Sequence, residues 1–144
     1  MDIAKLIEEA EAGSVVAQSI LGICYFEGID VGVDYDEAFR LLSMASNRGA
    51  RRARFYLARM YAEGLGITKS QIEAVRLYEA AASAGEFLAQ VEMGRIYSRG
   101  LGVPSNPDIA LKWYSAAIAK EDKLEDCLEL REAKAYVQAR KLDR

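Results

Sequence analysis

Histidine is absent from the 144-residue sequence, and its absence removes several kinds of chemistry. Without an imidazole there is no His-based catalytic triad, no side chain whose ordinary pKa lies near neutrality, and no ligand of the most common transition-metal type. No pair of carboxylates has the apolar neighbours that would raise a pKa for acid–base work. We therefore expect no catalytic residue, no metal site and no cofactor.

Cysteine, proline and long apolar runs are scarce as well. Cys24 and Cys127 lie far apart and in no CxxC arrangement, which favours free, buried thiols in a reducing compartment. No apolar segment approaches the ~18 residues that span a membrane. The charged, amphipathic start, MDIAKLIEEAEAG, lacks the apolar core of a signal peptide. We expect a cytoplasmic protein that inserts into no membrane.

Charge of one sign does not dominate. The formal net charge is −3 and the pI is near 5.1, so the chain has no general attraction for nucleic acid, and no nucleic-acid-binding motif appears. Apolar residues make up 51% of the sequence. A chain of this length and composition can bury a core, and we expect a single domain over residues 1–144.

What the sequence does contain is an internal repeat with a period of 36 residues. Three segments align without a gap: AQSILGICYFEGIDVGVDYDEAFRLLSMASNRG (17–49), ARFYLARMYAEGLGITKSQIEAVRLYEAAASAG (53–85) and AQVEMGRIYSRGLGVPSNPDIALKWYSAAIAKE (89–121). So many matched positions at one fixed offset indicate a repeat architecture. The matched columns are Ala17/Ala53/Ala89, Tyr25/Tyr61/Tyr97, Gly28/Gly64/Gly100, Ala38/Ala74/Ala110 and Ala45/Ala81/Ala117.

Each repeat predicts two helices. In the first, Ala17, Leu21, Cys24 and Tyr25 recur at helical spacing, and the column Gly22/Ala58/Gly94 predicts a close approach of two helices. The second helix begins after a polar cap in the column Asp34/Ser70/Asn106. Glu37 and Glu73 follow at capping-box spacing, and Pro107 takes the first helical position of the third repeat. Gly49 and Gly85 are placed to end second helices.

The pattern A-x₃-[LM]-[GA]-x₂-Y-x₂-G, then a polar cap and A-x₂-[LW]-[LY]-x₂-A, resembles the Sel-1-like repeat, a relative of the tetratricopeptide repeat. The resemblance implies an all-α fold: a right-handed α/α superhelical solenoid of helix-turn-helix repeats whose first helices line a concave face. It also implies an adaptor. One secreted, cysteine-rich branch carries a disulfide in each repeat and is linked to β-lactam binding. This sequence departs from that branch, because only one repeat contains a cysteine.

The flanks fit as caps of the array. Residues 1–13 resemble the second helix of a degenerate repeat, with Ile3 and Leu6 in register with Phe39 and Leu42. Residues 122–144 lose the register but keep helical spacing and many charges, which predicts a C-terminal capping helix.

The stretch EGLGITKS (63–70) has the glycines and the Lys-Ser pair of a phosphate-binding loop. Its sister segments, EGIDVGVD (27–34) and RGLGVPSN (99–106), keep the glycine and the cap but not the lysine. A P-loop also needs glycine directly before the lysine, where Thr68 stands. We interpret the stretch as a joint between helices, with Ser70 as a cap and Lys69 facing water. Asp30 stands where the other repeats have Gly66 and Gly102, and aspartate tolerates the left-handed geometry expected there.

The first-helix positions opposite the packed stripe are the candidate binding face. At 100° per residue they include three large apolar residues, Ile23, Phe26 and Phe55, which would form an apolar strip for a partner's helix or extended peptide. The alternative is that they pack against the N-terminal helix or a neighbouring repeat.

Arginine is concentrated near this face. Arg48, Arg51, Arg52, Arg54 and Arg59 fall within twelve residues, and Arg95 and Arg99 follow one repeat later. Such a cluster predicts a groove that grips a partner's carboxylates with bidentate hydrogen bonds, for which we select Arg54, Arg59, Arg95 and Arg99. The alternative is a solvated surface balanced by glutamates.

We therefore expect a non-enzymatic adaptor or scaffold. It would bind a peptide, loop or helix of a partner protein in the concave groove, and the bound segment would carry acidic groups. One alternative is an immunity or inhibitor protein that blocks a toxin. A remote one is a hydrolase related to the cysteine-rich branch. We also expect weak self-association, for which the acidic stretch 121–132 offers a complementary surface. The alternative is that this stretch is the solvent-exposed side of the capping helix.

Overall fold

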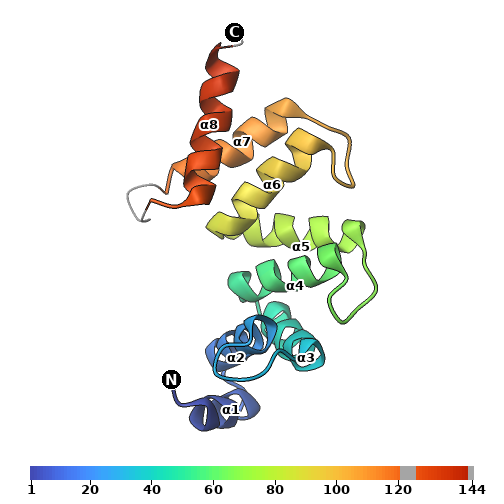
Figure 1. Ribbon diagram of the computed structural model, residues 1–144, viewed down its shortest axis with the longest axis vertical. Coiled ribbons are helices and arrows are strands. Elements are labelled where there is room, and N and C mark those ends of the chain that lie inside the picture. Colours follow the sequence, from blue (N-terminus) through green and yellow to red (C-terminus); the bar gives the residue numbers. More distant parts are fainter. Residues whose placement is uncertain (121–125, 143–144) are drawn as a thin grey trace. The chain divides into compact units, whose positions relative to one another are not determined.

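The computed structural model describes residues 1–120 and 126–142, which form eight α-helices and no strand (Figure 1). Three helix pairs follow one N-terminal helix, and a last helix follows the pairs. Each predicted repeat holds one pair. The bounds are α1 (Ile3–Glu11), α2 (Val15–Glu27) with α3 (Tyr35–Asn47), α4 (Arg51–Glu63) with α5 (Gln71–Ser83), α6 (Phe87–Arg99) with α7 (Pro107–Ile118), and α8 (Leu128–Leu142).

Contacts divide the chain into two compact units, residues 1–77 and 78–144, and the division falls within α5. In unit 1, α2 packs against α1 and α3, α3 packs against α4, and α2 also touches α4. In unit 2, α6 packs against α7, α7 packs against α8, and α6 also touches α8. In both units, therefore, the first helix of a pair (α2 or α6) contacts the second helix of its pair (α3 or α7) and also the helix that follows the pair (α4 or α8). That residues 1–144 behave as one domain stays a prediction.

The predicted helix starts are confirmed. Asp34 Oδ1 accepts a hydrogen bond from the Glu37 amide, the Ser70 hydroxyl accepts one from the Glu73 amide, and Asn106 Oδ1 accepts two from the first turn of α7. Lys69 beside the cap is exposed, so the stretch 63–70 is the predicted joint.

The reciprocal half of the predicted capping box was wrong. The cap N–H groups donate instead to the carbonyl of the tyrosine that recurs in each repeat, at 2.9 Å in all three pairs: Asp34 to Tyr25, Ser70 to Tyr61 and Asn106 to Tyr97. The carboxylates of Glu37 and Glu73 hydrogen-bond Arg40 and Arg76 one turn on. The hydrogen bond with Arg40 lowers the pKa of Glu37 below its ordinary value, although burial opposes the shift.

Close packing explains the glycines inside the first helices, as predicted. A Cβ on Gly22 would lie 2.8 Å from Leu42, and a Cβ on Gly94 would lie 2.7 Å from the Tyr114 ring. At the helix ends the backbone turns left-handed at Gly28, Gly64 and Gly100, and Asp30 adopts φ 59°, which confirms the expected conformation there.

Each unit has its own apolar core. In unit 1 the buried cluster joins α1, α2 and α3, and it includes Cys24, whose place on the packed stripe is confirmed. In unit 2 the cluster joins Val91 of α6, Tyr114 and Ala117 of α7, and Ala133 of α8. Across the described ranges, no helix is both long and apolar enough to cross a bilayer.

Candidate functional site

The predicted apolar strip in unit 1 is mostly packed rather than open. Ile23 is half-buried, whereas Phe26 and Phe55 are each only 6% exposed. Phe26 meets the rings of Tyr35 and Tyr56 edge-on, with centroids 6.0 and 5.2 Å apart, and Phe55 meets Tyr56 in the same way at 5.3 Å. The exposure expected for Phe26 and Phe55 was wrong, because both rings pack against Tyr56 of α4, which is a neighbouring helix for Phe26 and the same helix for Phe55.

Arg59 lies on the α2–α4 side of unit 1. Its guanidinium carbon lies 4.9 Å from the centroid of the Phe26 ring and 5.9 Å from that of Tyr56. Glu27 of α2 and Glu63 of α4 lie 3.7 and 3.8 Å from its terminal nitrogens. These ion pairs are long and partly exposed, so they hold Arg59 weakly in place.

Arg54 lies on a different side of α4 from Arg59. It shares its column with Gln18 and Gln90, whose Nε2 atoms donate to the carbonyls of Ala10 and Ala82 in the preceding helix. The register therefore turns half-buried Arg54 toward α3.

Arg95 and Arg99 belong to unit 2. Arg95 donates to Glu132 of α8 at 2.6 Å and also pairs with Glu92. Burial opposes its charge, but the two glutamates outweigh burial and raise the pKa of Arg95 above its ordinary value. Arg99, the last residue of α6, is exposed. The partner-binding role of the predicted arginines stays a prediction. Arg95 is already paired with Glu92 and Glu132 within unit 2.

The acidic stretch 121–132 is partly described. Glu121, Asp122 and Glu125 lie outside the described residues. Asp126 hydrogen-bonds Arg131, which lowers the pKa of Asp126, and Glu132 is bound to Arg95. These two acids therefore have partners within unit 2.

One surface that combines exposed apolar and basic residues is a groove on unit 1, with a volume of about 380 Å³. The N-terminal half of α2 supplies one wall, where Val16 is 68% exposed and Ile20 is 39% exposed. The turn from α3 into α4 supplies the other wall. We call it the Val16 groove; its lining is Val15, Val16, Ser19, Ile20, Arg48, Gly49, Ala50, Arg51 and Arg52.

The charge of the Val16 groove has one sign. Three arginines line it and no acidic residue does. α4 begins at Arg51 after the N-cap residue Ala50, which provides no side-chain hydrogen bond, and its first turn contains no acidic residue. The positive end of the helix therefore adds to the guanidinium charges at the same edge, an arrangement that attracts carboxylates.

Arg48, Arg51 and Arg52 belong to the arginine cluster noted in the sequence, but they were not among the predicted site residues, and the apolar wall was missed. The signal was present, because Val16, Ile20 and Ile23 recur at i, i+4 and i+7 along α2, on the side next to the buried Ala17, Leu21 and Cys24, about 100° around the helix. A helix with two apolar stripes can bury only one of them in the core, so the second stripe indicates an exposed apolar surface.

Other chemistry, such as metal binding or thiol catalysis, depends on other side chains. Within residues 1–120 and 126–142, no cluster of three Cys, Asp or Glu side chains could hold a metal ion. Cys24 is buried, and burial raises the pKa of its thiol above the ordinary value, which disfavours the nucleophilic thiolate. The helix pairs, the joints and the grooves between them are those of a helical-repeat solenoid of the kind that binds other proteins.

Comparison with known proteins identifies the repeat. The Sel1 repeat family model matches residues 15–49, 51–86 and 88–122, and the chain belongs to this family. A Sel1 repeat protein from Oxalobacter formigenes has a crystal structure that is similar, with 36% identity and a TM-score of 0.77; the match covers 96% of this chain and 98% of that one. No match was found among curated proteins.

A second solved structure is a protective antigen present in uropathogenic Escherichia coli strains, which displays the same fold. It is 28% identical with a TM-score of 0.74, and the match covers 95% of this chain but 32% of the antigen. Sel1 repeat proteins are generally non-enzymatic modules of protein–protein interaction. The predicted fold class and family are confirmed.

Proposed function

We propose that this protein is a non-enzymatic adaptor that binds an acidic, amphipathic segment of a partner protein on unit 1, at the Val16 groove. The observation that carries the proposal is the pairing of exposed Val16 and Ile20 with three arginines across one groove. Apolar side chains of the segment would cover the α2 wall, and its carboxylates would bind the arginines.

The predicted residues extend this face along unit 1. Ile23 continues the stripe of Val16 and Ile20, and Arg59 of α4 lies against Phe26, three residues further along α2. The weak pairs of Arg59 with Glu27 and Glu63 can be exchanged for a partner's carboxylate at little cost. Phe26 and Phe55 would then support the face from beneath, and Phe26 would hold Arg59 in position through its ring.

Site-specific photo-crosslinking in the native cell tests this proposal. A photoreactive amino acid replaces Val16 in one variant and Ile72 in the other, because both are exposed apolar helix positions, at 68% and 77%. We expect a discrete protein to be captured from position 16 and not from position 72. Equal capture at both positions would count against the groove.

Binding of the captured protein's acidic segment is then measured by calorimetry. We expect the double variant Arg51→Glu/Arg52→Glu to weaken binding at least tenfold, which corresponds to about 1.4 kcal/mol. The matched control is Lys69→Glu/Arg76→Glu, which reverses two exposed charges elsewhere in unit 1. Unchanged affinity in the first variant, with its helicity intact, would refute the assignment. Capture of a toxin enzyme would favour the inhibitor role over a general scaffold.

A further inference from the structure

The two end helices each occupy half of a repeat. α1 packs against α2 as α3 packs against α4, so α1 has the place of a second helix. α8 packs against α7 and touches α6 as α4 packs against α3 and touches α2, so α8 has the place of a first helix. Among the described residues, α1 has no first helix before it and α8 has no second helix after it.

The side of α8 that would meet a second helix can be identified from its register. Ala133 is buried in the cluster of α6, α7 and α8, as Ala17 is buried in the cluster of α1, α2 and α3. Val137 and Gln138 follow Ala133 at the spacing at which Leu21 and Gly22 follow Ala17. In α2 this side receives α3, whose Leu42 would meet a Cβ on Gly22.

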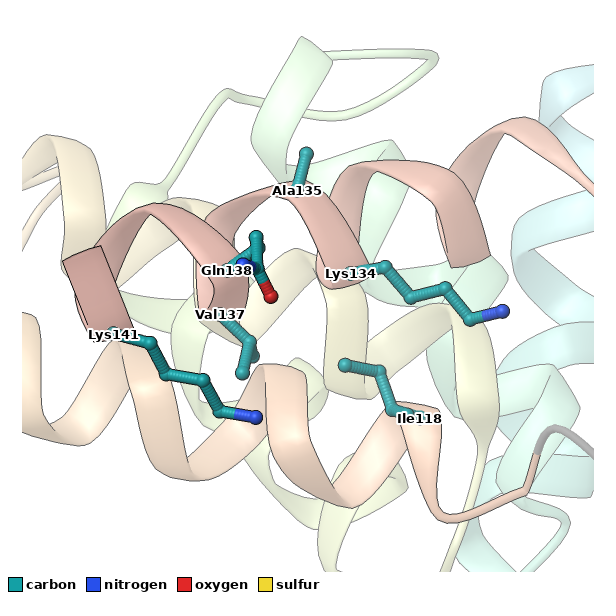
Figure 2. A pocket seen from close by; sticks show the side chains of 6 residues that line it. All are labelled: Ile118, Lys134, Ala135, Val137, Gln138 and Lys141. Atoms are coloured by element: carbon teal, nitrogen blue, oxygen red, sulfur yellow. The ribbon is translucent and has the colours of Figure 1, made fainter.

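A groove of about 500 Å³ lies on this side of α8 (Figure 2). Ile118 of α7 and Val137 of α8 point into the space between the two helices, and Lys134 and Lys141 of α8 lie on either side. α8 contains four basic residues and two acidic ones, and Glu132 faces away toward Arg95 of α6. The groove therefore has an apolar floor and a basic rim.

The outer side of α1 has the opposite charge. Leu6 and Ala10 are buried against α2, which leaves a stripe of Ala4, Glu8 and Glu11 exposed. The helix has three glutamates and a single lysine. A small residue such as Ala4 lets another helix approach closely, and glutamates at this spacing can meet lysines on the helix beside them.

We propose that α1 of a second copy of this chain docks in the α7–α8 groove, so that the protein associates head to tail. The incoming α1 would take the place of a second helix beside α8, and α8 would take the place of a first helix beside α1. The two surfaces differ, so the contact is heterologous and can continue from copy to copy. Glutamates against lysines at an exposed rim make the association weak and sensitive to salt.

Sedimentation of the full chain over a range of concentrations tests the proposal. We expect the average mass to rise with concentration at low salt and to fall back toward the monomer at high salt. The tail variant Lys134→Glu/Lys141→Glu and the head variant Glu8→Lys/Glu11→Lys should each remain monomeric. The control Lys69→Glu/Lys112→Glu, which changes exposed lysines outside both surfaces, should associate like the wild type.

Mixing the two variants is the decisive experiment. The tail variant keeps a wild-type α1 and the head variant keeps a wild-type α8, so their mixture should recover association. A wild type that stays monomeric at low salt would overturn the proposal, and so would a mixture that stays monomeric. Association of the head variant alone would also overturn it, because it would indicate contact between two like surfaces. None of these outcomes depends on the Val16 groove.

Discussion

Arg95 of α6 and Glu132 of α8 form a short, half-buried ion pair, with 2.6 Å between Nε and the carboxylate oxygen. Glu92 binds the same guanidinium from within α6. The arginine thus holds two glutamates together and ties the last described helix of unit 2 to α6.

Removing this arginine should loosen unit 2. We expect Arg95→Ala to lower the free energy of unfolding by about 1–3 kcal/mol, since two half-buried carboxylates lose a charged hydrogen-bond donor. Denaturant unfolding followed by the fluorescence of Trp113 in α7 measures the change. The control is Arg76→Ala, whose pair with Glu73 is more exposed and should contribute below about 1 kcal/mol. Equal effects would show that Arg95 is an ordinary surface cation.

Adding one methyl group to Gly94 should also destabilise the protein. In Gly94→Ala the new Cβ meets the rigid Tyr114 ring at 2.7 Å, an overpacking cost of about 1–3 kcal/mol. Better helix propensity returns up to about 1 kcal/mol. Gly22→Ala should cost less, because the flexible end of the Leu42 side chain can move.

Thermal unfolding of the two variants measures the difference. Gly32→Ala is the control, since nothing lies within 4 Å of its Cβ and its φ is not positive. It should leave stability unchanged or raise it by up to about 1 kcal/mol. Equal melting temperatures for the Gly94 and Gly32 variants would contradict the packing argument.

The two cysteines should differ in reactivity. Cys24 is buried with a raised thiol pKa, whereas Cys127 is half-buried. We expect Cys127→Ser, which retains Cys24, to react with a thiol reagent at least about tenfold more slowly than Cys24→Ser. Absorbance of the released thiolate follows both reactions, and denaturant should make the rates equal. Fast labelling of Cys24 in the folded protein would show that the α1–α2–α3 core opens readily.

The prediction of a single domain can be tested with two probes. Trp113 is the only tryptophan and reports on unit 2, whereas far-ultraviolet circular dichroism reports on every helix. If the chain unfolds as one domain, both signals should give one denaturant midpoint. A fluorescence transition separated from the dichroism transition would show that the units unfold independently.

The helices, joints and close contacts could be predicted because they depend on neighbours in the sequence. A cap residue acts within one turn, so Asp34, Ser70 and Asn106 can be recognised without the rest of the fold. The column Gly22/Ala58/Gly94 indicates a helix contact that recurs in each repeat, so this contact can be predicted from the 36-residue period alone.

The exposure of the candidate site could not be predicted in the same way. Helical angle shows which side of α2 Phe26 lies on, but not that Tyr56 of α4 covers it. The partner of Arg95 was also missed, because α8 departs from the 36-residue register and Glu132 has no counterpart in the other repeats. Both features depend on side chains from another helix.

The hydrogen bond from each cap amide to a tyrosine carbonyl uses backbone atoms alone. Each joint therefore closes without requiring a particular side chain at the position before its cap, as the column Val33/Lys69/Ser105 illustrates. Such a connection can accept foreign sequence while the helices it links keep their positions. These three loops are therefore suitable places to graft a reporter peptide, and places where related repeats can diverge without losing their fold.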